Sequence, residues 1–161
     1  MPKKPDSPAP LRLALYEPDI PQNTAAVLRT AACLAVPVDV IEPCGFVWGA
    51  KHMKRSGMDY LDRVEVRRHV DWAAFQDAHA GARRVLLTTR AETAHFDFAF
   101  QSGDILLFGR ESAGVPGAVH EAVDARLIIP MAAGARSLNL AASAALVLGE
   151  ALRQLDAFPA A

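Results

Sequence analysis

The sequence has few cysteines, no long uninterrupted apolar run and few aromatic residues. Its two cysteines, Cys33 and Cys44, match neither a disulfide framework nor a zinc-binding spacing, so we interpret both as free thiols. The longest apolar stretch, residues 138–149, is interrupted by Asn139 and Ser143 and is shorter than the roughly 20 residues that cross a bilayer. We therefore expect neither a disulfide-stapled scaffold nor a membrane partner.

An excess of charge of one sign is also missing. The 17 Lys and Arg residues are offset by 18 Asp and Glu residues, so the chain lacks the global basic signature of a nonspecific nucleic-acid binder. Positive charge gathers only in residues 51–70, around Tyr60, at Lys51, Lys54, Arg55, Arg63, Arg67 and Arg68. This segment is either a solvated face compensated by Asp59, Asp62 and Glu65 or a patch that contacts phosphates.

The chain length and its first residues indicate the domain organisation. Residues 1–10 contain four prolines, two lysines and no apolar run, which is typical of a disordered leader rather than a signal peptide. A chain of 161 residues that is 52% hydrophobic fits one globular domain. We therefore expect a leader over residues 1–10, a single domain over residues 11–161, and a cytoplasmic protein.

Short β-rich runs alternate with helical stretches along the chain. The runs cover residues 11–16, 38–43, 64–69, 83–89, 104–109 and 126–130. A first helix is predicted from Pro21, because Val27, Ala31 and Leu34 fall on one face, from which Arg29 points away. Asp71 opens a second helix. The alternation predicts an α/β fold with a mostly parallel sheet flanked by helices.

The last predicted helix, from about Leu138 to Leu155, is apolar nearly all round. Its apolar residues are Leu138, Leu140, Ala144, Leu146, Val147 and Leu148. A helix with this pattern is buried on every side. Because a C-terminal helix of so small a domain lies at the surface of its own sheet, its second face is expected to meet another subunit. The sequence thus predicts a homodimer.

Three loops carry polar residues next to predicted strand ends. The first is FGRESAGVP, residues 108–116, where glycines let a ligand approach the backbone and Glu111 is the one acid. The second, before the last helix, holds Arg136, Ser137 and Asn139. The third, LYEPDIPQNT, holds Asn23 and is followed by Arg29. All three are candidate parts of one ligand site.

Each of these residues also has a simpler interpretation. The glycine-rich loop can be an ordinary turn with a solvated glutamate. Ser137 can cap a helix that begins at Leu138, and Asn139 can be a turn residue. Arg29 and Arg136 can be solvated charges. Taken singly, none of these residues decides between structure and chemistry.

In combination, the order and spacing of these segments resemble the SPOUT superfamily of RNA methyltransferases. The resemblance runs from about Leu11 to Leu155 and rests on LYEPDIPQNT with Arg29, VIEPCGF, MDY, LLTT, FGRESAGVP, and IPM followed by RSLNL. It is strongest to the small members that methylate the ribose of the tRNA wobble nucleotide, cytidine or uridine 34. The resemblance implies a C-terminal trefoil knot, normally rare, a dimer with active sites at its interface, and S-adenosylmethionine bound in the knot.

The resemblance also implies the roles of individual residues. The cofactor pocket would be lined by Leu87, Gly109, Ile129, Met131, Ser137 and Leu138. The methyl-transfer site would contain Arg29, Asn23, Ser137 and Glu111. The tRNA anticodon loop would contact Arg136, Asn139, Lys54 and Arg55. A ribose hydroxyl must be aligned and its proton accepted or polarised, and that chemistry requires no metal.

Several positions depart from the pattern of the superfamily. Ala25 and Ala35 stand where relatives usually carry glycine, and Ala141 and Ala142 replace a Ser-Asn pair. Gly149 takes the place of a tyrosine on the helix expected to dimerise. The missing tyrosine bears on dimer packing and tRNA docking rather than on the cofactor site.

The sequence has three alternative functional interpretations. A Rossmann-type enzyme, in which Glu42 would bind ribose hydroxyls, is disfavoured because the turn after the first strand contains no glycine. A SPOUT ribose methyltransferase acting on ribosomal RNA or another tRNA position is a closer alternative. A non-catalytic RNA-binding module that kept the fold is the third.

Overall fold

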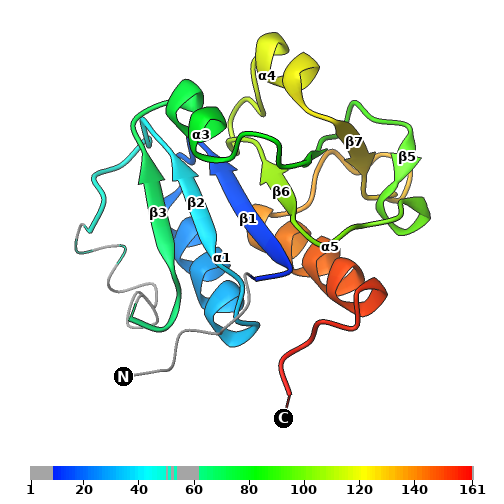
Figure 1. Cartoon of the computed structure of the whole chain (residues 1–161). Helices are drawn as coiled ribbons and strands as arrows, with labels where there is room; N and C mark the ends of the chain where they lie inside the picture. Colours follow the sequence, from blue (N-terminus) through cyan, green and yellow to red (C-terminus); the bar gives the residue numbers. More distant parts are fainter. Residues whose placement is uncertain (1–8, 50, 52, 54–61, 161) are drawn as a thin grey trace.

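A computed structural model describes residues 9–49, 51, 53 and 62–160, and within them the chain forms a seven-stranded sheet with helices on both faces (Figure 1). The strand order is β3-β2-β1-β6-β4-β7-β5, and every pairing is parallel. The strands are β1 (Leu11–Tyr16), β2 (Val38–Ile41), β3 (Val66–His69), β4 (Arg84–Leu87), β5 (Thr93–Ala94), β6 (Asp104–Phe108) and β7 (Ala125–Ile128). The predicted α/β fold with a parallel sheet is confirmed.

The helices of the described chain are α1 (Pro21–Cys33), α3 (Trp72–Ala78), the 3-10 turn η2 (His95–Asp97), α4 (Gly117–Ala122) and α5 (Leu140–Gln154). As predicted, α1 begins at Pro21, and the Asp71 side chain caps α3 by accepting from the backbone N–H of Ala74 at 2.8 Å. The short elements β5, η2 and α4 were not expected from the sequence. None of the helices within these residues is long and apolar enough to cross a membrane.

Alternate residues of the central strands enter two different cores. Leu11, Leu13 and Leu15 of β1 pack with α1 and α5 on one face of the sheet. Ala14 and Tyr16 pack on the opposite face, with α3 and α4. This period of two is what an extended strand imposes, and burial on both faces matches the near-continuous apolar runs of a parallel sheet.

Helices α1 and α5 lie side by side on the same face of the sheet (Figure 1). Val27 and Ala31 of α1 are buried and Arg29 is exposed, as the sequence predicts. The inner face of α5 is buried at Leu140, Ala144, Val147, Leu148, Ala151 and Leu152. Its outer face leaves Leu146 51% exposed, so the helix is not fully covered within one chain.

The start of α5 corrects one prediction. The helix begins at Leu140, two residues later than expected, and Asn139 is its N-cap. The Asn139 Oδ1 atom accepts from the backbone N–H groups of Ala141 at 2.9 Å and Ala142 at 3.3 Å. The prediction that Ser137 caps a helix beginning at Leu138 is therefore wrong, because Asn139 satisfies the first unpaired donors of the helix.

Both cysteines are free thiols, as expected. Cys33 is exposed near the end of α1, and Cys44 is partly buried. Burial, followed by the nearby Glu42 carboxylate, raises the pKa of the Cys44 thiol to about 11. The Cys44 side chain is therefore a neutral thiol near pH 7 and not a reactive thiolate.

A buried carboxylate joins the first three strands to α3. Asp39 is fully buried, and its Oδ2 atom accepts from Arg12 Nε at 2.7 Å. Its Oδ1 atom lies 2.7 Å from His69 Nε2 and 2.9 Å from His79 Nε2. We infer that both histidines donate Nε2–H to this oxygen, since a carboxylate oxygen only accepts.

The same Asp and His side chains are of the types that bind metals. The Arg12 guanidinium already neutralises Asp39, so a divalent cation here would leave an uncompensated charge in the interior. Both carboxylate oxygens of Asp39 already have hydrogen-bond partners. We therefore interpret the cluster as a structural tie between β1, β2, β3 and α3.

The substitution D39N is expected to lower the free energy of unfolding by about 3–5 kcal/mol near neutral pH, because it leaves Arg12 without its counter-charge. Burial alone would raise the pKa of Asp39, but hydrogen bonds from Arg12, His69 and His79 outweigh burial and hold that pKa below the usual range. The stabilisation is thus present above pH of about 4 and lost as the pH falls below it.

Urea unfolding of wild type and D39N at several pH values measures this difference. The matched control is D77N, on the exposed surface of α3, which is expected to change the free energy of unfolding by less than about 0.5 kcal/mol. Equal effects of D39N and D77N would contradict the structural role of Asp39.

Candidate active site

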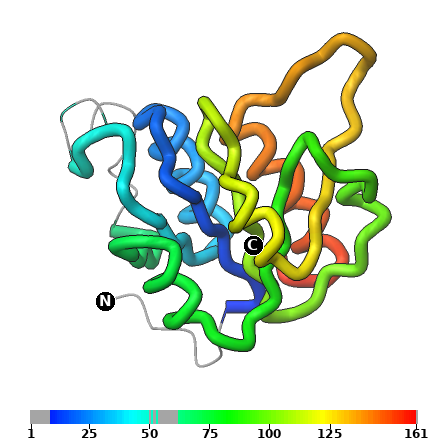
Figure 2. The backbone as a smooth tube through the Cα atoms, turned by 90° about the horizontal axis from the view of Figure 1, so that it is seen from above, coloured from blue at the N-terminus to red at the C-terminus, as the bar shows by residue number. Residues whose placement is uncertain are grey.

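A cavity of about 420 Å³ opens where strands β4, β6 and β7 end. Figure 2 looks onto these carboxyl ends, and the gold stretch between β7 and α5 reaches out from the body and returns. The lining comes from the ends of these strands, from the loops that follow them and from the start of α1. Carboxyl ends of parallel strands are where open α/β sheets bind their ligands.

Gly109 allows the loop after β6 to fold back on itself. A Cβ atom added at Gly109 would lie 2.6 Å from the backbone of Gly114, closer than any real side chain permits. Arg110 and Gly114 exchange two backbone hydrogen bonds, with Arg110 N to Gly114 O at 3.0 Å and Gly114 N to Arg110 O at 2.8 Å. The tight loop presents Glu111 to the cavity.

Glu111 links this loop to the segment between β1 and α1. Its Oε2 atom accepts from the backbone N–H of Asp19 at 3.0 Å. Burial, followed by a side-chain hydrogen bond to Asp19, raises the pKa of Glu111. The same hydrogen bond, with Ser112 and Arg110 and against the effect of burial, lowers the pKa of Asp19 to about 2.

Asn139 joins the third loop to the start of α1. While its Oδ1 atom caps α5, its Nδ2 atom donates to Asn23 Oδ1 at 2.9 Å. Both asparagines line the cavity, together with Ser137 and Leu138. Two segments that are 116 residues apart in the chain therefore meet at one wall of the site.

Most of the residues singled out from the sequence lie around this one cavity. Its lining includes all six predicted cofactor-binding residues, Leu87, Gly109, Ile129, Met131, Ser137 and Leu138. It also includes Asn23, Glu111 and Asn139. The fold thus brings the three predicted loops together, while the chemical roles of their residues stay predictions.

The predicted basic residues are placed differently. Arg29 is exposed on α1 and Arg136 is exposed in the loop before α5, and neither is among the described residues that line the cavity. Lys54 and Arg55 lie outside the described residues, as do Tyr60 and most of the predicted leader, residues 1–8.

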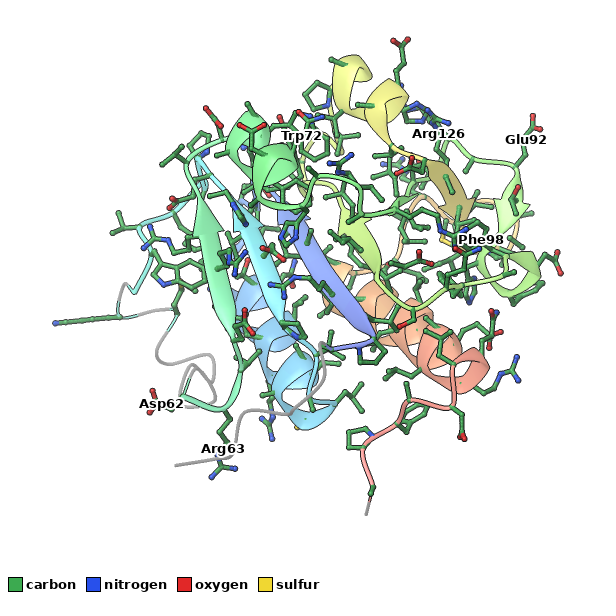
Figure 3. The ribbon with its side chains drawn as sticks, in the orientation of Figure 1. Asp62, Arg63, Trp72, Glu92, Phe98 and Arg126 are labelled. Atoms are coloured by element: carbon green, nitrogen blue, oxygen red, sulfur yellow. The ribbon has the colours of Figure 1, made fainter. Side chains whose placement is uncertain are left out.

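The described part of the basic segment is spread over two ends of the sheet. Arg63 and its neighbour Asp62 lie where the strands begin, away from the cavity (Figure 3). Arg68 donates from Nε to Glu42 Oε1 at 3.2 Å, and its guanidinium carbon lies 5.2 Å from the centre of the Trp48 ring. Arg68 is thus compensated by Glu42, an acid from outside the segment, rather than by the Asp59, Asp62 and Glu65 that the solvated-face interpretation names.

The sequence did not single out some residues of the site. Thr88, Thr89, Arg110 and Ser143 line the cavity, and Asp19 contacts Glu111 from behind it. Asp19, Thr88 and Arg110 stand inside motifs that carried the resemblance, so proximity to those motifs was the available signal. Their contacts depend on loop geometry, which spacing along the chain does not determine.

Residues 10–149 match the SpoU rRNA Methylase family, and this match spans the three loops and the whole cavity. The chain belongs to this family. As a SpoU family member it has curated relatives of similar length. One is the tRNA (cytidine(34)-2'-O)-methyltransferase of Ancylobacter novellus, which is 54% identical over 150 residues and covers 92% of this chain and 95% of the relative.

Solved structures of SpoU relatives share the fold. One is a structure described as providing structural insights into the 2-OH methylation of C/U34 on tRNA. It has a TM-score of 0.87 at 44% identity, and the match covers 91% of the present chain and 96% of the chain in that structure. The SpoU methyltransferase AviRb from Streptomyces viridochromogenes, in complex with the cofactor AdoMet, has a TM-score of 0.82 at 28% identity and covers 94% of this chain and 63% of AviRb.

Two variants of Asn139 separate its two hydrogen-bonding roles in this SpoU protein. N139A removes both the cap and the bond to Asn23, and is expected to lower the free energy of unfolding by about 1–2 kcal/mol. N139D keeps an oxygen that caps α5 but has no donor for Asn23 Oδ1, so its loss is expected to be smaller. Chemical denaturation measures both, and a cap role is contradicted if N139A is as stable as wild type.

Proposed function

We propose that this SpoU protein is an S-adenosylmethionine-dependent methyltransferase that modifies the ribose 2'-oxygen of the wobble nucleotide, cytidine or uridine 34, in tRNA. The observation that carries the proposal is a single cavity lined by all three motif loops in a chain 54% identical to a cytidine 34 methyltransferase. Because its substrate is tRNA, we expect it to act in the cytoplasm.

The cavity suits a nucleoside-sized cofactor. Its volume of about 420 Å³ lies within the usual range of small-molecule sites. Leu87, Ile129 and Met131 offer apolar surface, and Gly109 has no side chain between a ligand and the backbone. We infer that these residues, with Ser137 and Leu138, hold S-adenosylmethionine. When bound, this cofactor supplies a methyl group made electrophilic by its sulfonium.

The remaining task of the protein is to align the ribose hydroxyl and polarise its proton. A guanidinium stays protonated in proteins and only donates hydrogen bonds, so Arg29 is better suited to clamp a phosphate and the hydroxyl than to act as a base. Ser137 would orient the hydroxyl or the cofactor, and Asn23 would act through its bond to Asn139. Glu111 fixes the loop after β6 against Asp19. Arg136, Asn139, Lys54 and Arg55 are the proposed contacts to the anticodon loop.

We also propose that residues 11–161 form one SPOUT domain whose C-terminal part is a trefoil knot. Support comes from membership of the SpoU family and from the course of residues 129–139. This segment lines the same cavity as the loops after β4 and β6, so it runs close beside both before α5 begins.

The outer face of α5 supports a homodimer. Ala142 and Ala145 are exposed there, Leu146 is 51% exposed, and a Cβ atom added at Gly149 would meet nothing within 4 Å. These residues form an apolar stripe, and Leu138 and Leu140 of the cavity lining adjoin it along the chain. A second copy seated on this stripe would bring two cavities to one interface, as the resemblance implies.

Methyl transfer from labelled S-adenosylmethionine to tRNA taken from cells that lack this activity tests the function. Label is expected at the ribose of nucleotide 34, located by nuclease digestion. R29A is expected to reduce kcat/KM by about a hundredfold, since a misplaced hydroxyl loses the advantage of alignment. R29K keeps the charge without the planar fork and is expected to be intermediate.

The outcomes separate the alternatives. Label at another nucleotide would keep the fold and the chemistry but change the substrate. Cofactor binding without any transfer, to tRNA or ribosomal RNA, would favour a non-catalytic RNA-binding module. Full activity of R29A would remove Arg29 from the mechanism while leaving the proposed reaction intact.

Oligomeric state is tested by light scattering coupled to size-exclusion chromatography. Wild type is expected to be a dimer, and L146D is expected to be mainly monomeric because it places a charge in the centre of an apolar interface. The control is V70D, at a valine 76% exposed beyond the end of β3, which is expected to leave the dimer unchanged. A monomeric wild type would overturn the homodimer.

A further inference from the structure

Two carboxyl groups from separate loops meet behind the cavity. Asp19 lies between β1 and α1, and Glu111 lies in the loop after β6. The Asp19 backbone N–H donates to Glu111 Oε2 at 3.0 Å. The Asp19 Oδ2 atom accepts from the Ser112 hydroxyl and lies 3.5 Å from Arg110 Nε. One oxygen of each carboxyl group therefore has a conventional partner.

The other two oxygens have none. Asp19 Oδ1 and Glu111 Oε1 are buried, and neither accepts a hydrogen bond from any donor among the described residues. The bond from the Asp19 N–H to Glu111 Oε2 holds the two residues together, so the partner left for these two oxygens is a hydrogen bond from one carboxyl group to the other. Two carboxylate oxygens are both acceptors, so such a bond requires a proton between them. Without it, two buried acceptors would be unpaired and two negative charges would face each other.

We propose that a single proton joins Asp19 to Glu111, and that Asp19 is a positioning residue that holds Glu111 as a neutral carboxylic acid at the wall of the cavity. The resemblance to the superfamily assigns no role to Asp19 or to this proton. The geometry assigns them because it leaves two oxygens without any other partner.

The surroundings decide which group carries the proton. Burial and then the hydrogen bond to Asp19 raise the pKa of Glu111, whereas that bond, Ser112 and Arg110 hold the pKa of Asp19 at about 2. The other charged or titratable groups nearby are Glu17, whose Oε2 atom lies 3.4 Å from Arg110 Nη1, and the neutral Cys44 thiol. The negative charge thus sits on Asp19, next to Arg110, and the proton sits on Glu111.

Close backbone packing keeps Asp19 in place. A Cβ atom added at Gly45 would lie 2.6 Å from the Cβ atom of Asp19, so only glycine allows this approach. The Gly45 N–H donates to Pro18 O at 2.9 Å. The loop after β2 therefore packs directly against Asp19 and restricts the movement of its backbone.

The role in the reaction rests on the proposed function. A protonated Glu111 adds no negative charge to a cavity that must receive an RNA phosphate. It also cannot accept the proton of the ribose hydroxyl, so Glu111 is not the base while it is neutral. Asp19 influences methyl transfer only through Glu111, whose protonation and orientation it controls.

Carboxyl-carbon NMR of the full chain, labelled with ¹³C at glutamate, tests the shared proton directly, and E111Q assigns the signal. Glu111 is expected to titrate clearly above the usual glutamate value of about 4.3. In D19N the neighbouring charge is gone and the new amide can donate to the carboxylate, so the proton affinity of Glu111 is expected to fall at least about tenfold. D97N, on the exposed surface of η2, is the control and should leave the signal unchanged.

A wild-type Glu111 that titrates at or below about 4.3 would overturn the proposal. This test uses the wild-type protein, with E111Q only to assign the signal. An unchanged titration in a folded D19N would overturn it as well. The measurement uses neither RNA nor cofactor. It therefore stands even if the proposed tRNA substrate is wrong.

A double-mutant cycle tests the positioning role. Near neutral pH, D19N is expected to reduce kcat about tenfold, with recovery as the pH is lowered and Glu111 regains its proton. In an E111Q background, where residue 111 is neutral at every pH, adding D19N is expected to cost less than about threefold. Equal losses in both backgrounds, without pH dependence, would mean that Asp19 is only structural and would overturn its positioning role.

Discussion

Parallel pairing of β6 with both β1 and β4 is the constraint on which the site depends. Because these strands and β7 run in one direction, their carboxyl ends lie at a single edge. The loops that follow them, together with the start of α1, then have to share that edge. No single loop carries the chemistry. The sheet supplies the distances between loops, and the loops supply the side chains.

The two polar clusters of the molecule show different uses of a buried carboxylate. Asp39 has a partner for each oxygen, and the donors come from two strands, β1 and β3, and from the end of α3. Such a saturated network fixes the relative position of elements. Asp19 and Glu111 instead leave an oxygen each without a donor, at the wall of a cavity. Incomplete pairing of this kind is typical of sites that do chemistry.

Much of the fold was readable from the sequence because its strands are continuous apolar runs and α1 has a clear periodicity. The exceptions have physical causes. Strand β5 has only two residues, and α4 is a six-residue helix after Pro116, so neither is long enough to show a period. The cap of α5 was misassigned because Ser137 and Asn139 are both good caps, and only the backbone conformation distinguishes them.

The site was readable in part, for a related reason. Its lining residues stand inside motifs, and the order of the motifs was enough to gather them. The contacts between loops were not readable, since Asp19 and Glu111 are 92 residues apart. Backbone conformation was not readable either. Ala35 has a φ of 56°, a left-handed conformation that favours glycine, and glycine is usual at that position in relatives.

The bond between Asn23 and Asn139 has a consequence for synthesis of the chain on the ribosome. Asn23 is made before its partner and the first turn of α5, because Asn139 follows it by 116 residues. A nascent chain that has already paired β1, β2 and β6 still lacks one wall of the cavity. The growing polypeptide therefore has an incomplete cavity until Asn139 and α5 have been made and have folded against α1.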